Sequence, residues 1–126
     1  MIGKLPEEWL KQADYDMETA EFMFRGGRYF YSVFMCHLAV EKSLKGLYRL
    51  KLDEVPPKTH NLVFLLKKVG IKPPEGVDML LVTLTEAQVD VRYPDDMAML
   101  QTNYTKSVKD LLANAKEVLK WIKMQF

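Results

Sequence analysis

The chain has 126 residues, of which 48% are hydrophobic and 28% are charged, the size and composition of one ordinary globular domain. This balance excludes an extensively disordered chain, which has too little apolar surface to fold. Lys and Arg number 18 against 17 Asp and Glu, so the net charge is +1. That value lacks the basic excess of dedicated duplex-DNA binders, although a local basic patch would still allow nucleic acid.

Hydrophobic periodicity predicts two long helices in the first half of the sequence. Pro6, followed by two glutamates, begins a helix over about residues 6–25, and Gly26-Gly27 ends it. A second helix is expected over about residues 28–51, where the run YFYSVFMC is apolar nearly all round. A helix of that kind packs on more than one side, so we expect it at the centre of the fold.

Three shorter or later helices follow a proline pair. Thr59 is the expected N-cap of a short third helix that ends at Gly70. A fourth helix is expected over about residues 76–90, and the last begins between residues 97 and 104 and continues to about residue 125. The fold class is therefore predicted to be all-α, an antiparallel up-and-down bundle of about five helices.

Neither a membrane span nor a disulfide is expected. No stretch has the roughly twenty uninterrupted apolar residues that a span needs, and residues 1–8 lack the apolar core of a signal peptide. We therefore expect a single domain over residues 1–126, located in the cytoplasm. The lone cysteine, Cys36, stands in an apolar run, which predicts a small buried hydrophobe rather than a nucleophile.

The second predicted helix carries a narrow polar stripe between apolar neighbours. Four residues project from it in nearly one direction: His37, Glu41, Lys45 and Tyr48. One interpretation is a solvated strip with an i,i+4 ion pair between Glu41 and Lys45. The other is a groove between helices, in which partly buried charges need partners from another helix or from a ligand. The sequence leaves both open.

Two further sets of residues are candidates for contacting a phosphate. Lys42 and Arg49 lie on a neighbouring direction of the same helix and form a small basic cluster with Lys45, although snorkelling side chains explain this equally well. His60 stands at the start of the third helix, where backbone N–H groups and the helix dipole favour an anion. Local capping by Thr59 is the simpler alternative there.

The segment Arg92-Tyr93-Pro94-Asp95 concentrates a guanidinium, a phenol and a carboxylate in one loop, because the residue before a proline is pushed out of the helical region. These groups either anchor the loop through an Arg–carboxylate pair or project into a site. No metal is expected, since the chain has only two histidines and an i,i+4 His/Glu pair supplies too few ligands. No cofactor is expected either, because no glycine-rich phosphate loop is present.

Four segments, taken in order, resemble the HEPN family (higher eukaryotes and prokaryotes nucleotide-binding domains). They are residues 9–16 (WLKQADYD), 39–47 (AVEKSLKGL), 58–62 (KTHNL) and 91–95 (VRYPD). Trp121 near the C-terminus also fits, and the resemblance spans almost the whole chain. It implies a bundle of about five helices that is usually a homodimer. Small prokaryotic members often accompany a minimal nucleotidyltransferase in a toxin–antitoxin-like pair.

The resemblance also implies a possible activity. Many HEPN proteins are metal-independent ribonucleases with an Arg-x4–6-His motif, whose His and Arg act on the RNA backbone across the dimer. This chain departs from that motif: eight residues separate Arg28 from His37, ten separate Arg49 from His60, and no histidine follows Arg92. Position 37 is more often glutamine in this subgroup, which sets His37 apart within the stripe.

The leading hypothesis is a non-catalytic HEPN-like module that binds a nucleotide or a nucleotidyltransferase partner. Its expected ligand-binding residues are Glu41, Lys42, Lys45, His60, Arg92, Tyr93 and Asp95. The cationic groups would hold phosphate or an acidic partner surface, Glu41 would orient Lys45, and Tyr93 would stack on a base.

Two alternatives stay open. One is a metal-independent RNA endonuclease with His60 or His37 as the acid/base and Arg92 as the phosphate clamp. The other is a purely structural homodimeric subunit, supported by the aromatic run at residues 29–31 and the Met-rich segment at residues 97–99, since such residues are common interface anchors.

Overall fold

A computed structural model describes residues 3–92 and 105–126. This part of the chain contains five α-helices and no strand, which confirms the all-helical prediction. The helices are α1 (Pro6–Arg25), α2 (Tyr29–Leu52), α3 (Leu62–Val69), α4 (Val77–Arg92) and α6 (Thr105–Met124). None of the described helices is both long and apolar enough to cross a membrane.

The first two helices form an antiparallel hairpin whose bounds match the prediction to within one residue. Pro6 occupies the first turn of α1, where its missing N–H costs nothing. Gly26 ends the helix, and Gly27 turns the chain with a φ of 78°, a conformation that favours glycine. Phe24 and Tyr29 close the turn, with ring centroids 5.4 Å apart.

The start of α3 corrects one prediction. Thr59 is not its N-cap: the cap is Asn61, whose side-chain oxygen accepts a hydrogen bond from the Phe64 N–H at 3.1 Å. Thr59 instead accepts one from the backbone N–H of Asn61, 3.1 Å away, so it orders the approach to the helix. Gly70 ends α3 in the left-handed region, as predicted.

The later bounds differ slightly from the expected ones. Helix α4 is described to Arg92, two residues beyond the expected end, so Arg92 is helical instead of belonging to the following loop. Helix α6 is described from Thr105, and the predicted window for its first residue, 97–104, lies outside the described residues. Tyr93 and Asp95 of the expected loop, and the Met-rich segment at residues 97–99, lie outside the described residues.

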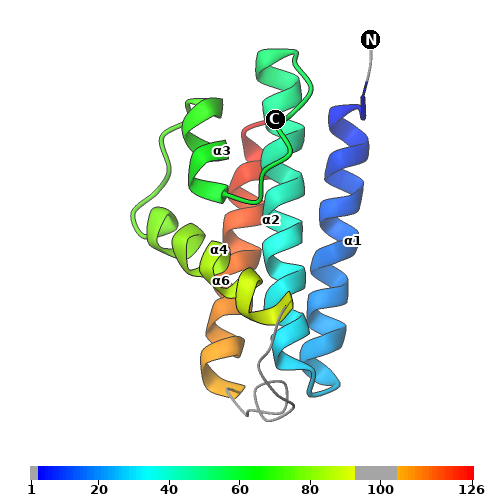
Figure 1. Ribbon diagram of the computed structural model, residues 1–126, viewed down its shortest axis with the longest axis vertical. Helices are drawn as coiled ribbons and strands as arrows, with labels where there is room; N and C mark the ends of the chain where they lie inside the picture. Colours follow the sequence, from blue (N-terminus) through cyan, green and yellow to red (C-terminus); the bar gives the residue numbers. More distant parts are fainter. Residues whose placement is uncertain (1–2, 93–104) are drawn as a thin grey trace.

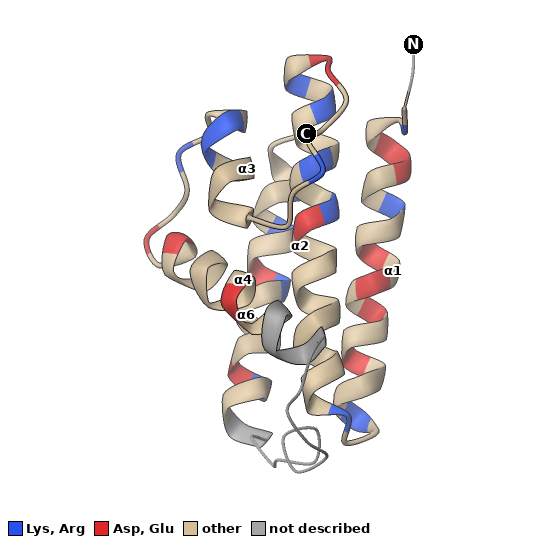
Figure 2. Ribbon diagram, in the orientation of Figure 1, with Lys and Arg blue, Asp and Glu red and all other residues tan. Residues whose placement is uncertain are grey.

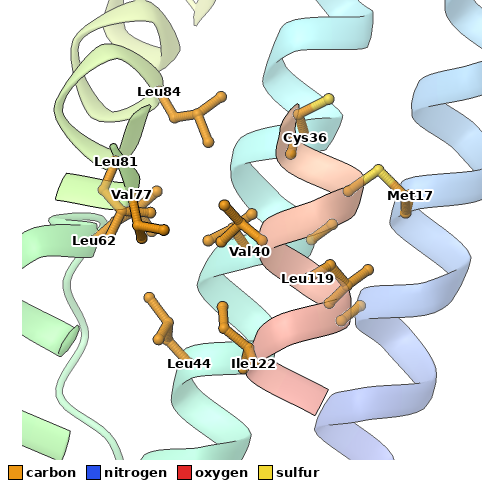
Figure 3. Packing of buried hydrophobic residues seen from close by; sticks show 14 of the residues in the cluster. Met17, Cys36, Val40, Leu44, Leu62, Val77, Leu81, Leu84, Leu119 and Ile122 are labelled. Atoms are coloured by element: carbon orange, nitrogen blue, oxygen red, sulfur yellow. The ribbon is translucent and has the colours of Figure 1, made fainter. Parts of the chain in front are cut away.

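Helix α2 is the centre of the fold, as its all-round apolar composition predicts. It contacts the four other helices of the described residues, with α1 along one side, α6 behind it running in the same direction, and α3 and the inclined α4 on the other side (Figure 1). The largest fully buried apolar side chains come from α2, α3, α4 and α6 and meet around Val40 and Leu44 (Figure 3). Every polar group on this helix must therefore find a protein partner or reach an edge of the bundle.

Cys36 is part of that core, with 1% of its surface exposed, which confirms the prediction of a buried hydrophobe. Burial raises the pKa of its thiol from 9.0 to about 12. Because the unfolded chain ionises this thiol first, its contribution to stability is complete below pH 9 and is lost as the pH rises towards 12. At pH 10 the expected loss is on the order of 1 kcal/mol.

Urea unfolding at pH 7 and pH 10 measures this loss. The wild type should lose on the order of 1 kcal/mol more of its free energy of unfolding between the two pH values than Cys36→Ala does. Tyrosines and lysines that also titrate are present in both proteins, so their contributions cancel in the comparison. Equal losses in the two proteins would show that the Cys36 thiol is not held neutral by burial.

Candidate functional site

The polar stripe of α2 is buried. His37 is 0%, Glu41 5% and Lys45 8% exposed, which rules out the solvated strip and leaves the groove interpretation. Much of the cover is the connection between α2 and α3, residues 53–61, which runs back along α2 (Figure 1). The stripe is thus enclosed between a helix and a loop, and the loop brings His60 to it.

Glu41 is the centre of the buried network. Its Oε2 accepts a hydrogen bond from Lys45 Nζ at 2.9 Å, and its Oε1 lies 2.8 Å from His60 Nδ1. The Nδ1 atom of His37 is 3.7 Å from the same Oε1. Both carboxylate oxygens therefore have close partners, which is the condition under which a buried charge is tolerated. Sequence spacing indicates the Lys45 contact, but not the contact with His60.

His37 holds the backbone of the same loop. Its Nε2 is 2.9 Å from the carbonyl oxygen of His60. Since a carbonyl only accepts, Nε2 carries the proton and donates. The two contacts act on one residue: His37 fixes the main chain of His60, and Glu41 fixes its ring. His37, which looked exceptional from the sequence, is therefore a positioning residue for the loop.

The ring of His60 is the accessible part of the cluster. Its side chain is 45% exposed, whereas the carboxylate that holds it is buried. With Nδ1 donating to Glu41, the remaining ring nitrogen, Nε2, is the one available to a ligand. Neutral imidazole presents an acceptor there, and protonated imidazole presents a donor. This arrangement is suited to binding an anion or to transferring a proton.

The basic residues predicted to bind phosphate are already paired. Lys42 Nζ lies 2.8 Å from Asp16 Oδ2 on α1, and Arg49 Nη1 lies 2.6 Å from Asp53 Oδ1. Lys45 is paired with Glu41. Each of the three cations therefore has a carboxylate beside it, and none of the three contributes to an open basic patch.

The helical spacing of Arg49 and Asp53 makes that ion pair visible in the sequence. The Lys42–Asp16 pair joins two helices, and no local pattern indicates it. Asp16 is nevertheless buried, with 6% of its surface exposed, which makes it a structural anchor between α1 and α2 that sequence analysis missed. Lys42 is thereby directed towards α1 and does not contribute to the contacts around His60.

The far end of the stripe is closed by aromatic residues. The Lys45 ammonium lies 6.0 Å from the centre of the Trp9 ring, and Lys4 lies 3.9 Å from the same ring. Tyr48 donates a hydrogen bond to Glu54 at 3.3 Å. Burial raises the pKa of the Tyr48 hydroxyl, and the nearby Glu54 carboxylate raises it further. Tyr48 therefore stays neutral through physiological pH.

The structure does not test whether the other expected site residues, Arg92, Tyr93 and Asp95, join this cluster. Arg92 is the last residue of α4, and its side chain, like Tyr93 and Asp95, lies outside what the structure describes. Trp121 lies on α6, half-buried, and lines a cavity of about 430 Å³ between α6 and the start of α4. Within residues 3–92 and 105–126, no three His, Cys, Asp or Glu side chains gather as a metal site would require.

The geometry defines an all-helical module with a buried polar stripe and one exposed, carboxylate-held histidine. Its sequence matches the HEPN domain model over residues 6–125. The chain therefore belongs to the HEPN family, and the resemblance drawn from the four sequence segments is confirmed.

Two crystal structures have the same fold. TT1696 from Thermus thermophilus superimposes with a TM-score of 0.85 at 23% identity, covering 96% of this chain and 98% of that one. ST0689, described as an archaeal HEPN homologue, superimposes with a TM-score of 0.78 at 28% identity and 98% coverage of both chains. A search of curated proteins found no match.

Proposed function

We propose that this HEPN domain binds a phosphate-bearing ligand, a nucleotide or an RNA, through the exposed edge of His60. The observation that supports this most directly is the 2.8 Å contact between His60 Nδ1 and the buried Glu41 carboxylate. The carboxylate fixes the orientation of the ring, and in protonated imidazole the second N–H is a donor for phosphate oxygen. The half-exposed ring leaves that donor open to solvent.

The surroundings of His60 narrow the expected ligand set. Lys42, Lys45 and Arg49 each pair with a carboxylate. We therefore expect the ligand to contact groups of the loop instead of these three side chains. Lys58, two residues before His60, is exposed and has no ion pair within the described residues. A site with one imidazole and one flexible lysine suits a single phosphate group better than an extended nucleic-acid backbone.

The test uses the two histidines as reporters in proton NMR. Titrating AMP, ATP and a short RNA should shift the ring signals of His60, which are assigned by their loss in His60→Gln. That variant should bind at least about tenfold more weakly, because a charge-assisted hydrogen bond contributes about 1.5–3 kcal/mol. Lys72→Gln, which removes a charge from an exposed loop position, is the matched control. Unchanged His60 signals at millimolar ligand would refute phosphate binding at this loop.

A second candidate is metal-independent cleavage of RNA with His60 as the acid/base. The specific support is again the carboxylate–imidazole pair, which orients a ring nitrogen for proton transfer. It predicts RNA cleavage in the presence of EDTA that disappears in His60→Ala and persists in His37→Gln at reduced rate, since His37 only positions the loop. Equal cleavage by wild type and His60→Ala would show that His60 is not the acid/base of the reaction.

The family resemblance extends the proposal to a protein partner, a minimal nucleotidyltransferase in a toxin–antitoxin-like pair. The exposed His60 ring and Lys58 would then contact a phosphate or an acidic surface that the partner carries. Co-expression with such a nucleotidyltransferase, followed by size-exclusion chromatography, tests the pairing. A complex that forms equally well with the Lys58→Glu/His60→Gln variant would place the contact elsewhere.

A further inference from the structure

The cavity of about 430 Å³ between α6 and the start of α4 has the dimensions of a ligand site. Pockets that hold small molecules in proteins measure about 300–1,000 Å³ and are lined mostly by apolar and aromatic groups. Here Val77 and Leu80 of α4 and Val118 of α6 supply the apolar lining, and Trp121 supplies an aromatic ring. The cavity shares no residue with the cluster around His60.

The polar lining of this cavity is acidic. Glu75 comes from the segment before α4 and Glu117 from α6, so the two carboxylates belong to two different walls, and Asn114 adds a carboxamide. Neither carboxylate has an ion pair or a hydrogen bond within the described residues. Lys116, the sequence neighbour of Glu117, pairs with Glu21 on α1 instead. Of the described lysines and arginines, none lines the cavity.

The charges at this cavity determine the sign of the ligand it would take. The N-terminus of α4 lies here too, and its dipole is equivalent to about half a positive charge. Two ionised carboxylates outweigh that dipole, and the start of α4 is correspondingly acidic in Figure 2. The face of an indole ring also attracts a cation. The cavity is therefore suited to a positively charged ligand.

The apolar lining favours an organic cation over a metal ion. A metal ion needs several oxygen, nitrogen or sulfur ligands close together. Within residues 3–92 and 105–126, no three His, Cys, Asp or Glu side chains gather in that way. An alkyl chain, in contrast, would cover the valine, leucine and tryptophan surfaces that a metal ion leaves exposed to water.

We propose that this cavity binds a small organic dication, an aliphatic chain with an amino or guanidinium group at each end. One cationic group pairs with Glu75 and the other with Glu117, so that both carboxylates gain a partner. The chain between them lies against Leu80 and Trp121. Because no residue is shared with the His60 loop, this inference is independent of the proposed phosphate ligand.

Agmatine, which has an amine and a guanidinium joined by an alkyl chain, is the probe for a direct test. The protein has two tryptophans, and their indole N–H signals are followed by nuclear magnetic resonance. The Trp121 signal is assigned by its loss in Trp121→Phe. Agmatine should shift it until binding saturates in the millimolar range or below. Trp9, which does not line the cavity, is the internal reference and should not shift.

Charge-neutralising variants test the two carboxylates. Glu75→Gln and Glu117→Gln should each raise the dissociation constant of agmatine about fivefold, the upper range for an ion pair between exposed groups. The double variant should raise it more than about tenfold, because the two contributions add. Asp78→Asn is the matched control: it removes the same charge from the first turn of α4 but does not line the cavity. It should change binding less than about twofold, because salt screens exposed charges.

A blocked arginine distinguishes a free dication from a protein side chain. N-acetylarginine methylamide carries a single cation, as an arginine of a partner protein does. It should bind at least about fivefold more weakly than agmatine, since it leaves one carboxylate unpaired. Both glutamates are exposed, so their variants are expected to fold, which circular dichroism verifies. A Trp121 signal that does not move in millimolar agmatine overturns the proposal. So does equal weakening by Asp78→Asn, or equal affinity for the blocked arginine.

Discussion

Glu41→Leu is expected to lower the free energy of unfolding by about 3–5 kcal/mol, because it leaves the Lys45 ammonium buried without its carboxylate. Lys45 is only 8% exposed, and its ammonium lies 2.9 Å from the carboxylate that the substitution removes. The same change releases the His60 ring, which loses its 2.8 Å contact, and with it the order of the covering loop. Guanidinium unfolding followed by circular dichroism measures the loss.

The double variant Glu41→Leu/Lys45→Met distinguishes an unpaired charge from a loss of packing. Replacing both members of a buried ion pair by apolar groups of similar size is often nearly neutral. It should therefore recover most of the stability lost in Glu41→Leu. Asp14→Ala is the matched control, because it breaks an ion pair whose side chains are 41% and 45% exposed, and it should cost no more than about 1 kcal/mol. A double variant as unstable as Glu41→Leu would contradict this explanation.

The helices were predictable because their signals are local. Pro6, the glycine pair at residues 26–27 and Gly70 each act through the backbone within one turn, and the structure keeps all three boundaries. The start of α3 was not predicted correctly, because Thr59 and Asn61 are both good caps and stand two residues apart. Which of them caps depends on the path of the preceding loop, and that path is fixed by contacts with α2.

The site was likewise predictable only where its contacts are local in the sequence. The i,i+4 spacing of Glu41 and Lys45 identified their ion pair, but it could not tell whether the pair was buried. Burial follows from the loop that carries His60, and that loop is held by Glu41 and His37 from 19 and 23 residues away in sequence. The prediction of an open basic cluster was wrong for the same reason, because Lys42 pairs with Asp16 on another helix. Long-range partners decide which charges remain for a ligand.

Gly46→Ala is expected to destabilise the protein by about 2 kcal/mol, although alanine is the better helix former by about 1 kcal/mol. A Cβ atom at this position would lie 2.8 Å from Cβ of Trp9 and 3.2 Å from the carbonyl oxygen of Pro6. Neither is the end of a flexible side chain, so α1 itself would have to move away from α2. Thermal and urea unfolding show directly whether the variant is less or more stable than the wild type.

Gly26→Ala is the matched control, because its φ is −84° and the nearest atom to an added Cβ is at 3.4 Å, an ordinary contact. It should change stability by no more than about 0.5 kcal/mol. A stabilised Gly46→Ala would mean that the two helices are not in close contact there. That contact also sets the position of Trp9, whose ring lies 6.0 Å from the Lys45 ammonium. Gly46 therefore links the packing of α1 on α2 to the closed end of the stripe, and its substitution should also change Trp9 fluorescence.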